Sequence, residues 1–295
     1  MLVTYSNVYE LLHAVCKNEA QILLPAAGYF MSIADDKSVE VLESLAKNTS
    51  LRYLSMENVA LFHKELRLTP ESDRVTLISD AFKANTNLCT LHMPQLNNNG
   101  TSMAANILHV NTSLKSLVLT HCSSDNIGMN NNRIISALQQ NVTLTSLDMR
   151  HVGISAAVGH TLVEMVGSNE LKLTALHLFT ISHDQMYENL SQNTSLTAFS
   201  CESYFNKYFD KDSMVRLLLR NHTLELLNVE HTSHIDVSHR DTLRRALHLN
   251  TSLVSLTLDR WSGDFEEALA ANRSSSVFAK KTTLLRWHSI KSLFK

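Results

Sequence analysis

The fold is decided by Asn111-Thr112-Ser113-Leu114-Lys115-Ser116-Leu117-Val118-Leu119, a stretch that recurs along the chain. Near-identical copies begin at Asn48 and Asn250, diverged copies begin at Asn85, Asn141, Asn193 and Asn221, and a stretched copy begins at Asn169. All follow the frame Asn-x-x-Leu-x-x-Leu-x-Leu, in which Met, Phe, Val or Cys sometimes replaces a leucine. The first leucines of the eight copies span 202 residues from Leu51 to Leu253, so seven intervals give a mean period of about 29 residues.

A period of this length with this phrase resembles the ribonuclease-inhibitor-like class of leucine-rich repeats, which has a true helix in each repeat. The resemblance covers roughly residues 35 to 260. It implies an α/β fold: a leucine-rich-repeat solenoid, shaped as a horseshoe, with a parallel β-sheet on the concave face and α-helices on the convex face. The chain is longer than a typical single globular core, and a solenoid explains this because each repeat buries its face against its neighbours.

Three segments are expected along the chain. Residues 1–34 are predicted to form an N-terminal helical cap or degenerate repeat, residues 35–260 about eight leucine-rich repeats, and residues 261–295 a C-terminal cap and a basic tail. Terminal repeats are atypical because one side of them faces water. Asn48 is predicted to end the first repeat helix in the left-handed conformation that asparagine tolerates. The Leu173–Leu196 interval of 23 residues is short, which predicts a helix about one turn shorter than the others.

Composition excludes several classes of protein. An apolar fraction of 44% argues against disorder, and a formal charge of −2 gives no general attraction to nucleic acid or anionic lipid. The four cysteines form no CxxC pair, no secretory signal is visible, and no apolar run is long enough to span a bilayer. A cytoplasmic protein is therefore expected, without membrane insertion, without nucleic acid as partner, and monomeric.

Six repeat asparagines also match the glycosylation sequon, namely Asn48, Asn111, Asn141, Asn193, Asn221 and Asn250. The repeat places them at helix ends that face the next strand, where a glycan would interfere with stacking. A structural role is therefore favoured over glycosylation, which agrees with the cytoplasmic expectation.

Catalytic signatures are absent from the sequence: there is no GxxxxGK[ST], HExxH, GxSxG or GxGxxG motif. Fifteen histidines raise the question of a metal, and His231 and His234 lie beside Glu230, Asp236 and His239. No spaced pair completes four ligands there, so a polar loop is favoured. We expect no enzymatic activity, no cofactor and no metal.

Stacking the repeats aligns the positions between the leucines into columns on the concave surface. One column contains Glu202, Glu230 and Asp259 in three consecutive repeats, with Glu225 expected nearby. Neighbouring strands lie roughly 5 Å apart, so these carboxylates are predicted to form an acidic strip. Such a strip would attract a partner with a basic surface and raise its association rate, although a solvated polar face explains it too.

A second, mixed patch is predicted on the same face. It combines aromatic and ionisable side chains, and its members are His92, His121, His151, Arg150, His177 and Phe179. Asp148 is a further candidate for partner binding on this face. Phe179 amid polar neighbours is a plausible binding anchor, whereas ordinary variation between repeats is the alternative explanation.

These features favour a protein–protein interaction module that binds a partner protein through the concave face. The bare array with an asparagine-rich and histidine-rich composition resembles effectors that intracellular bacterial pathogens secrete into the host cytosol without a cleaved N-terminal signal. The alternative is a regulator of a GTPase or of actin filaments. The Asn-Thr-Ser-Leu phrase resembles the arrays of Ran GTPase activators and of tropomodulin-type proteins, but the acidic tail of the former and the amphipathic segments of the latter are missing.

Overall fold

The computed structural model describes residues 1–25, 35–56, 71–94, 98–120, 127–150, 156–179, 185–202, 211–230, 237–258 and 265–274. The strands are β1 (Leu2–Tyr5), β2 (Ile22–Pro25), β3 (Tyr53–Ser55), β4 (Thr90–Pro94), β5 (Ser116–Thr120), β6 (Ser146–Met149), β7 (Ala175–Phe179), β8 (Ala198–Glu202), β9 (Leu226–Glu230) and β10 (Ser255–Leu258). The helices are α1 (Val8–Lys17), α2 (Asp35–Lys47), α3 (Glu71–Ala84), α4 (Asn98–Val110), α5 (Ile127–Gln140), α6 (Ala156–Gly167), α7 (Met186–Gln192), α8 (Lys211–Arg220), α9 (Val237–Leu249) and α10 (Glu266–Arg273).

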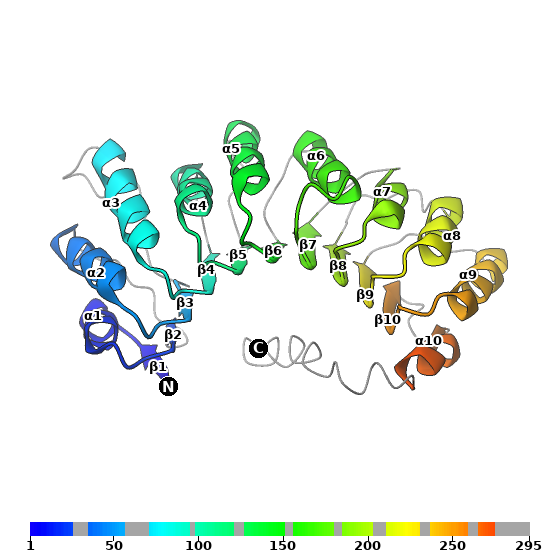
Figure 1. Ribbon diagram of the computed structural model, residues 1–295, viewed down its shortest axis with the longest axis horizontal. Helices are drawn as coiled ribbons and strands as arrows, with labels where there is room; N and C mark the ends of the chain where they lie inside the picture. Colours follow the sequence, from blue (N-terminus) through cyan, green and yellow to red (C-terminus); the bar gives the residue numbers. More distant parts are fainter. Residues whose placement is uncertain are drawn as a thin grey trace.

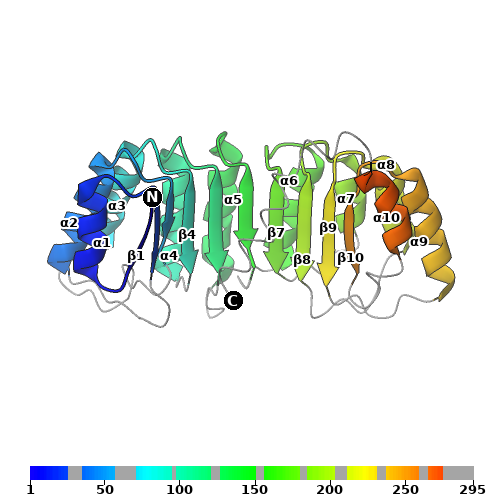
Figure 2. The same cartoon turned by 90° about the horizontal axis from the view of Figure 1, so that it is seen from below.

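The strands form one sheet in chain order from β1 to β10, and every neighbouring pair is parallel. The sheet follows the inner side of an arc, and the helices cover its outer side (Figure 1). Seen from below, the strands lie side by side across the concave face (Figure 2). The predicted fold class, a leucine-rich-repeat solenoid, is confirmed.

The phased leucines build the core as predicted. The second leucine of each repeat lies in register with that of the next repeat, from Leu54 through Leu117 and Leu147 to Leu256. These side chains are at most 4% exposed, and a single apolar cluster runs from Tyr5 to Leu269. The period therefore fixes which side of each strand faces the helices, because alternate strand residues point to opposite faces.

The N-terminal segment contributes more sheet than expected. Residues 1–34 were expected to form a helical cap or a degenerate repeat, and the segment 22–24 does become β2. Strand β1, which pairs with β2 over four residues and starts the sheet, was not predicted. Its Tyr5 is 1% exposed and donates a hydrogen bond from its hydroxyl to the Ser55 carbonyl oxygen at 2.6 Å, so the first strands are tied to β3.

Helix α7 confirms the expectation from the short interval, because it has 7 residues where the other helices have 8 to 14. It also packs closely on the end of α6. A Cβ atom added to Gly167 would lie 2.9 Å from the Asn189 Cβ and 3.0 Å from its carbonyl oxygen. Glycine at this position therefore permits the approach of the shortened helix.

The repeat asparagines form a ladder along the solenoid that is interrupted at Asn169, whose Nδ2 donates instead to the Gly167 and Gln192 carbonyls. In Asn48, Asn85, Asn111, Asn141, Asn193, Asn221 and Asn250, Oδ1 accepts the backbone N–H groups two and three residues later at 2.7–3.1 Å. Each Nδ2 donates to a helix-end carbonyl of the preceding repeat at 2.6–2.8 Å. We call these seven residues the asparagine ladder. It satisfies backbone groups that the turn from helix to strand leaves without partners.

The ladder corrects one prediction. Asn48 does not end its helix in the left-handed conformation, because Asn18 and Asn169 are the only described residues other than glycine with positive φ, at 55° and 60°. Asn48 is instead 3% exposed and uses both ends of its amide within the ladder. This agrees with a structural role for the six sequon asparagines, whose amide nitrogens all donate to the preceding repeat.

At the C-terminal end of the solenoid, α10 covers the last repeat. Asn272 Nδ2 donates to the Asn250 and Leu253 carbonyls at 2.9 and 2.7 Å, and Arg273 Nε donates to the Val254 carbonyl at 2.8 Å. Arg273 also donates to Glu266, and this hydrogen bond lowers the pKa of the Glu266 carboxyl. Of the predicted C-terminal cap and basic tail, residues 261–295, the stretch 275–295 lies outside the described residues.

Candidate concave binding site

The backbone register of the sheet aligns the concave columns that the repeat predicts. We call the residues that follow the second leucine of each repeat the middle column, and neighbouring strands align them in the order Ser55, His92, Val118, Asp148, His177, Ser200, Asn228 and Thr257. Since their neighbours on either side along the strand are core residues, these positions lie on the opposite, concave face of the sheet.

Burial within this column departs from the expectation of an open surface. Ser55 is 0% exposed, Asp148 1%, Ser200 5% and His92 9%, whereas Val118, His177, Asn228 and Thr257 are partly exposed. His92 and Asp148 are thus not freely exposed binding residues. Polar groups buried to this extent need partners, and side chains on the concave face supply them.

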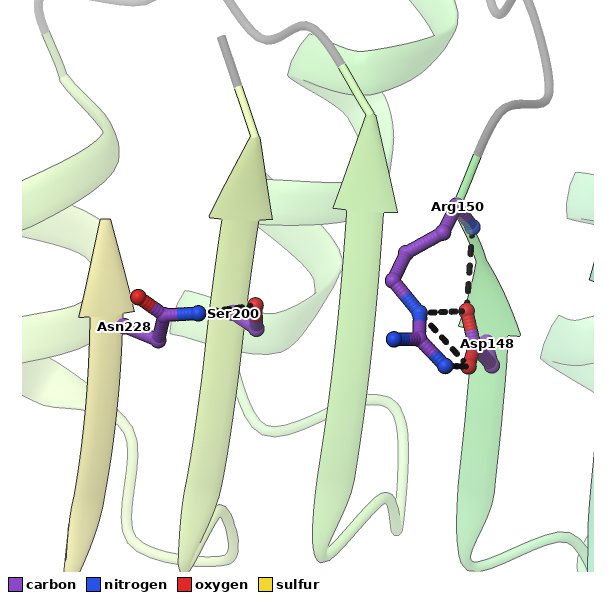
Figure 3. A network of polar contacts seen from close by, with 4 residues as sticks. All are labelled: Asp148, Arg150, Ser200 and Asn228. Atoms are coloured by element: carbon purple, nitrogen blue, oxygen red, sulfur yellow. Dashed lines mark hydrogen bonds and ion pairs between the residues drawn. The ribbon is translucent and has the colours of Figure 1, made fainter. Parts of the chain in front are cut away.

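Asp148 and Arg150 form an ion pair near the centre of the sheet. The Arg150 Nε lies 3.0 and 2.9 Å from the two carboxylate oxygens of Asp148, and the Arg150 backbone N–H donates to Oδ1 at 3.0 Å. The Arg150 side chain turns back toward Asp148 along the end of β6 (Figure 3). The Asp148 side chain is 1% exposed and the Arg150 side chain 23%, so the guanidinium is the accessible part of the pair.

A second polar contact joins β8 and β9, which lie two and three strands from β6. Here Asn228 Nδ2 donates to Ser200 Oγ at 3.3 Å (Figure 3). His177 lies between the two contacts, because β7 places it in register with both Asp148 and Ser200. We call Asp148, Arg150, His177, Ser200 and Asn228 the central polar cluster. It spans β6 to β9 and combines a cation, an imidazole and an amide on the concave face.

Sequence reasoning missed part of this cluster. Ser200 and Asn228 belong to the aligned column, but only the tertiary structure reveals their hydrogen bond across strands. Asp148 and Arg150 were both named, but not as a pair. Their spacing of two residues on a strand puts both on one face, and that signal could have predicted the ion pair.

The acidic strip is supported only in part. Glu202 and Glu230 are paired by register at the ends of β8 and β9, while Asp259 lies outside the described residues. Glu225 does not belong to the strip: it precedes β9, five residues before Glu230, and is therefore about 16 Å away along the strand.

The mixed patch divides into two parts. His92 pairs with Ser55, whose Oγ lies 3.1 Å from His92 Nδ1, and Val118 separates His92 from Asp148 in the register. Phe179, at the end of β7, is in register with Glu202. The other two histidines of the patch, His121 and His151, lie outside the described residues. The structure thus brings together Asp148, Arg150 and His177, and places His92 about 10 Å away across two strand spacings.

Within the described ranges, no group of three His, Cys, Asp or Glu side chains is arranged to hold a metal ion. Of the residues considered for a metal, His231, His234 and Asp236 lie outside those ranges. In the same part of the chain, no helix is long and apolar enough to cross a membrane.

The fold and the concave columns define a leucine-rich-repeat solenoid. No protein-family model matches the chain, and no curated protein matches it. Among solved structures, "Leiomodin-1 Actin-Binding Site 2 (ABS2)" is similar over 55% of this chain and 86% of that chain, with 19% sequence identity and a TM-score of 0.36. A likeness at that level says nothing about what this chain binds.

Arg150→Ala is expected to lower the free energy of unfolding by about 2 kcal/mol. Removing the guanidinium leaves the buried Asp148 carboxylate with its backbone donor alone, and an uncompensated buried charge typically costs about 3–5 kcal/mol. The remaining backbone hydrogen bond and the partial exposure of Arg150 reduce that cost. Urea denaturation followed by circular dichroism measures the change. The double variant Asp148→Ala/Arg150→Ala should be more stable than Arg150→Ala alone, and a less stable double variant would contradict the pairing.

Proposed function

We propose that this chain binds a partner protein across the concave face of its sheet and carries no catalytic activity of its own. The observation that supports this best is the central polar cluster, in which an ion pair between Arg150 and Asp148 and a hydrogen bond from Asn228 to Ser200 hold side chains in place on an open sheet. Groups already fixed before binding lose little conformational entropy when a partner arrives, which favours specific recognition.

The size of the face also favours a protein over a small molecule. Ten strands at a spacing of about 4.8 Å give a sheet roughly 43 Å long across the strands, which suits a macromolecular interface. Small-molecule sites are typically enclosed pockets, whereas a curved repeat array offers an extended surface with substitutable positions.

The charges suggest two complementary features of the partner. At the centre, the Arg150 guanidinium is the accessible half of its ion pair and suits a carboxylate or a backbone carbonyl, beside the partly exposed His177. At the ends of β8 and β9, Glu202 and Glu230 are adjacent in register and suit a basic group. A partner with both signs of charge, its basic part over β8 and β9, fits this face best.

To test the concave site, the tagged chain is used to capture proteins from a host-cell lysate, and the captured proteins are identified by mass spectrometry. The affinity of the chain for each purified partner is then measured. We expect Glu202→Lys/Glu230→Lys and His177→Ala each to reduce the affinity by tenfold or more. The matched control is Glu43→Lys/Asp80→Lys, which reverses two exposed charges on α2 and α3 of the convex layer and should bind like the wild type. Equal affinity for wild type and all concave variants, or equal loss in the control, would reject the concave site.

The narrower hypotheses rest on the sequence resemblances alone. A secreted effector, a Ran GTPase activator-like regulator and a tropomodulin-like regulator of actin filaments would all use the same face. A GTP-hydrolysis assay and an actin-capping assay distinguish the last two, because each predicts activity in one assay and none in the other. For the effector hypothesis, the readout is transfer of the tagged chain into host cells by a bacterium with a functional secretion system and not by one without it.

A further inference from the structure

The first strand leaves the sheet open at its N-terminal edge. The topology places β1 at one end of the ten strands, with β2 as its only neighbour among the described residues. At the opposite end, α10 supplies Asn272 and Arg273 as donors to the carbonyls of the last repeat. No described side chain does the same for the outer edge of β1, and Figure 1 shows no described strand on that side of β1.

Hydrogen bonding identifies the backbone groups that point outward. The Met1 carbonyl accepts the Gln21 and Ile22 N–H groups at 2.9 and 3.2 Å, so residue 1 bonds toward β2. Backbone groups alternate sides along a strand, so Val3 and Tyr5 also bond toward β2. The N–H and carbonyl groups of Leu2 and Thr4 therefore face away from the sheet, at an edge that no described strand pairs.

Strand β1 itself lacks two features that normally prevent pairing at an edge. Its sequence, Leu2-Val3-Thr4-Tyr5, contains no charge and no proline. Met1 is 60% exposed, Leu2 58% and the neighbouring Ile22 39%, and Tyr9 at the start of α1 is 67% exposed. Apolar side chains thus surround an unpaired strand, the combination that favours association of two edges.

We propose that β1 pairs with β1 of a second copy of this chain in an antiparallel arrangement. A two-fold axis at Val3 perpendicular to the sheet places Leu2 opposite Thr4 of the second copy, and Thr4 opposite its Leu2. In antiparallel ladders alternate pairs exchange both hydrogen bonds, so these two pairs use every outward group of Leu2 and Thr4. The same surface serves both copies, as a two-fold interface requires.

This arrangement joins two solenoids at their N-terminal ends into one sheet whose concave faces open to the same side. It replaces the monomer expected from the sequence. One strand pair and a few apolar side chains bury less than a standard interface, so the dissociation constant is expected to be micromolar and not nanomolar. The proposal does not depend on the proposed function, because the pairing edge lies outside the concave columns.

Sedimentation velocity of the 295-residue chain, tagged at its C-terminus, tests the proposal over about 1 to 500 μM, a range set by the micromolar expectation. The wild type should shift from monomer to dimer. Thr4→Pro removes one outward N–H group and leaves the hydrogen bonds to β2 intact, and Leu2→Lys adds a charge to the edge. Both variants should therefore remain monomeric, with a circular dichroism spectrum like that of the wild type. A wild type that stays monomeric throughout, or a Thr4→Pro variant that dimerises equally, would overturn it.

Disulfide trapping tests the register separately. In a background with exposed Cys16 changed to serine, Val3→Cys places two thiols on a non-hydrogen-bonded pair with Cα atoms about 4.5 Å apart, which a disulfide can bridge. Leu2→Cys is the matched control, because its two copies lie on a diagonal about 7–8 Å apart. Under mild oxidation, the yield of covalent dimer from Val3→Cys should be well above the yields from Leu2→Cys and from the Cys16→Ser parent. Equal yields would reject the antiparallel register.

Discussion

Asn221→Ala should lower the free energy of unfolding by about 4 kcal/mol, because it removes one complete step of the asparagine ladder. Asn221 is 3% exposed; its Nδ2 donates to the Leu190 and Asn193 carbonyls at 2.8 and 2.9 Å, and its Oδ1 accepts from the Thr223 and Leu224 N–H groups at 3.0 and 2.8 Å. Alanine leaves the Thr223 and Leu224 N–H groups without an acceptor, and each buried unsatisfied group costs about 1–3 kcal/mol. The two carbonyls lose their amide donor and keep only longer bonds, from the Asn193 N–H to the Leu190 carbonyl at 3.2 Å and from Thr223 Oγ1 to the Asn193 carbonyl at 3.4 Å. Urea denaturation measures the loss.

The matched control for this prediction is Asn132→Ala, an exposed asparagine of α5 with no side-chain hydrogen bond given by the structure. It should change stability by no more than about 0.5 kcal/mol, because surface substitutions away from special features are nearly neutral. Asn221→Asp retains the acceptor but replaces the donor with a carboxylate facing two carbonyls, so at neutral pH it should cost at least as much as alanine. If Asn221→Ala proved as mild as Asn132→Ala, the ladder would not be a stabilising element.

Leu147→Ala should cost about 4 kcal/mol, near the upper end of the range for buried leucines. Leu147 is 0% exposed in the middle of β6, and its in-register neighbours Leu117 and Leu176 are also 0% exposed. The cavity left by alanine closes poorly, because the paired strands fix the spacing of the neighbouring leucines. Thermal and urea denaturation measure the change.

Val142→Ala, in the same repeat, is the control for the leucine prediction, since Val142 is 82% exposed and should tolerate truncation within about 0.5 kcal/mol. Unfolding of a repeat array can proceed in parts, so hydrogen exchange of β5, β6 and β7 should accompany the global measurement. A small loss, with protection unchanged in those three strands, would contradict a tightly packed core at Leu147.

The pattern of leucines predicted the architecture well, because it is local and repeated. Leu54, Leu117 and Leu256 were assigned to the inner side of their strands from spacing alone, and all are buried. The shortened α7 follows from the interval of 23 residues between Leu173 and Leu196. Strand β1 was missed, because a lone four-residue strand outside the repeat has no phased partner in the sequence.

The candidate site was less predictable. Column membership follows from the period, which is why Asp148, His177 and Asn228 share one column. Their exposure does not follow from it, because a side chain on an open sheet is covered or left free by the size and polarity of residues from neighbouring repeats. Asp148 is buried because Arg150 folds over it, and Glu225 lies at the opposite end of its strand from Glu230.

The sequence by itself determined the repeat, its phase and the faces of each strand, since spacing along one chain sets which side chains share a side. Only the tertiary structure decided which polar groups pair across strands, which asparagine amides reach the preceding repeat, and which edge of the sheet is left open. Those features depend on distances between residues about 20 to 40 positions apart, which are set when the repeats stack and which no local pattern records.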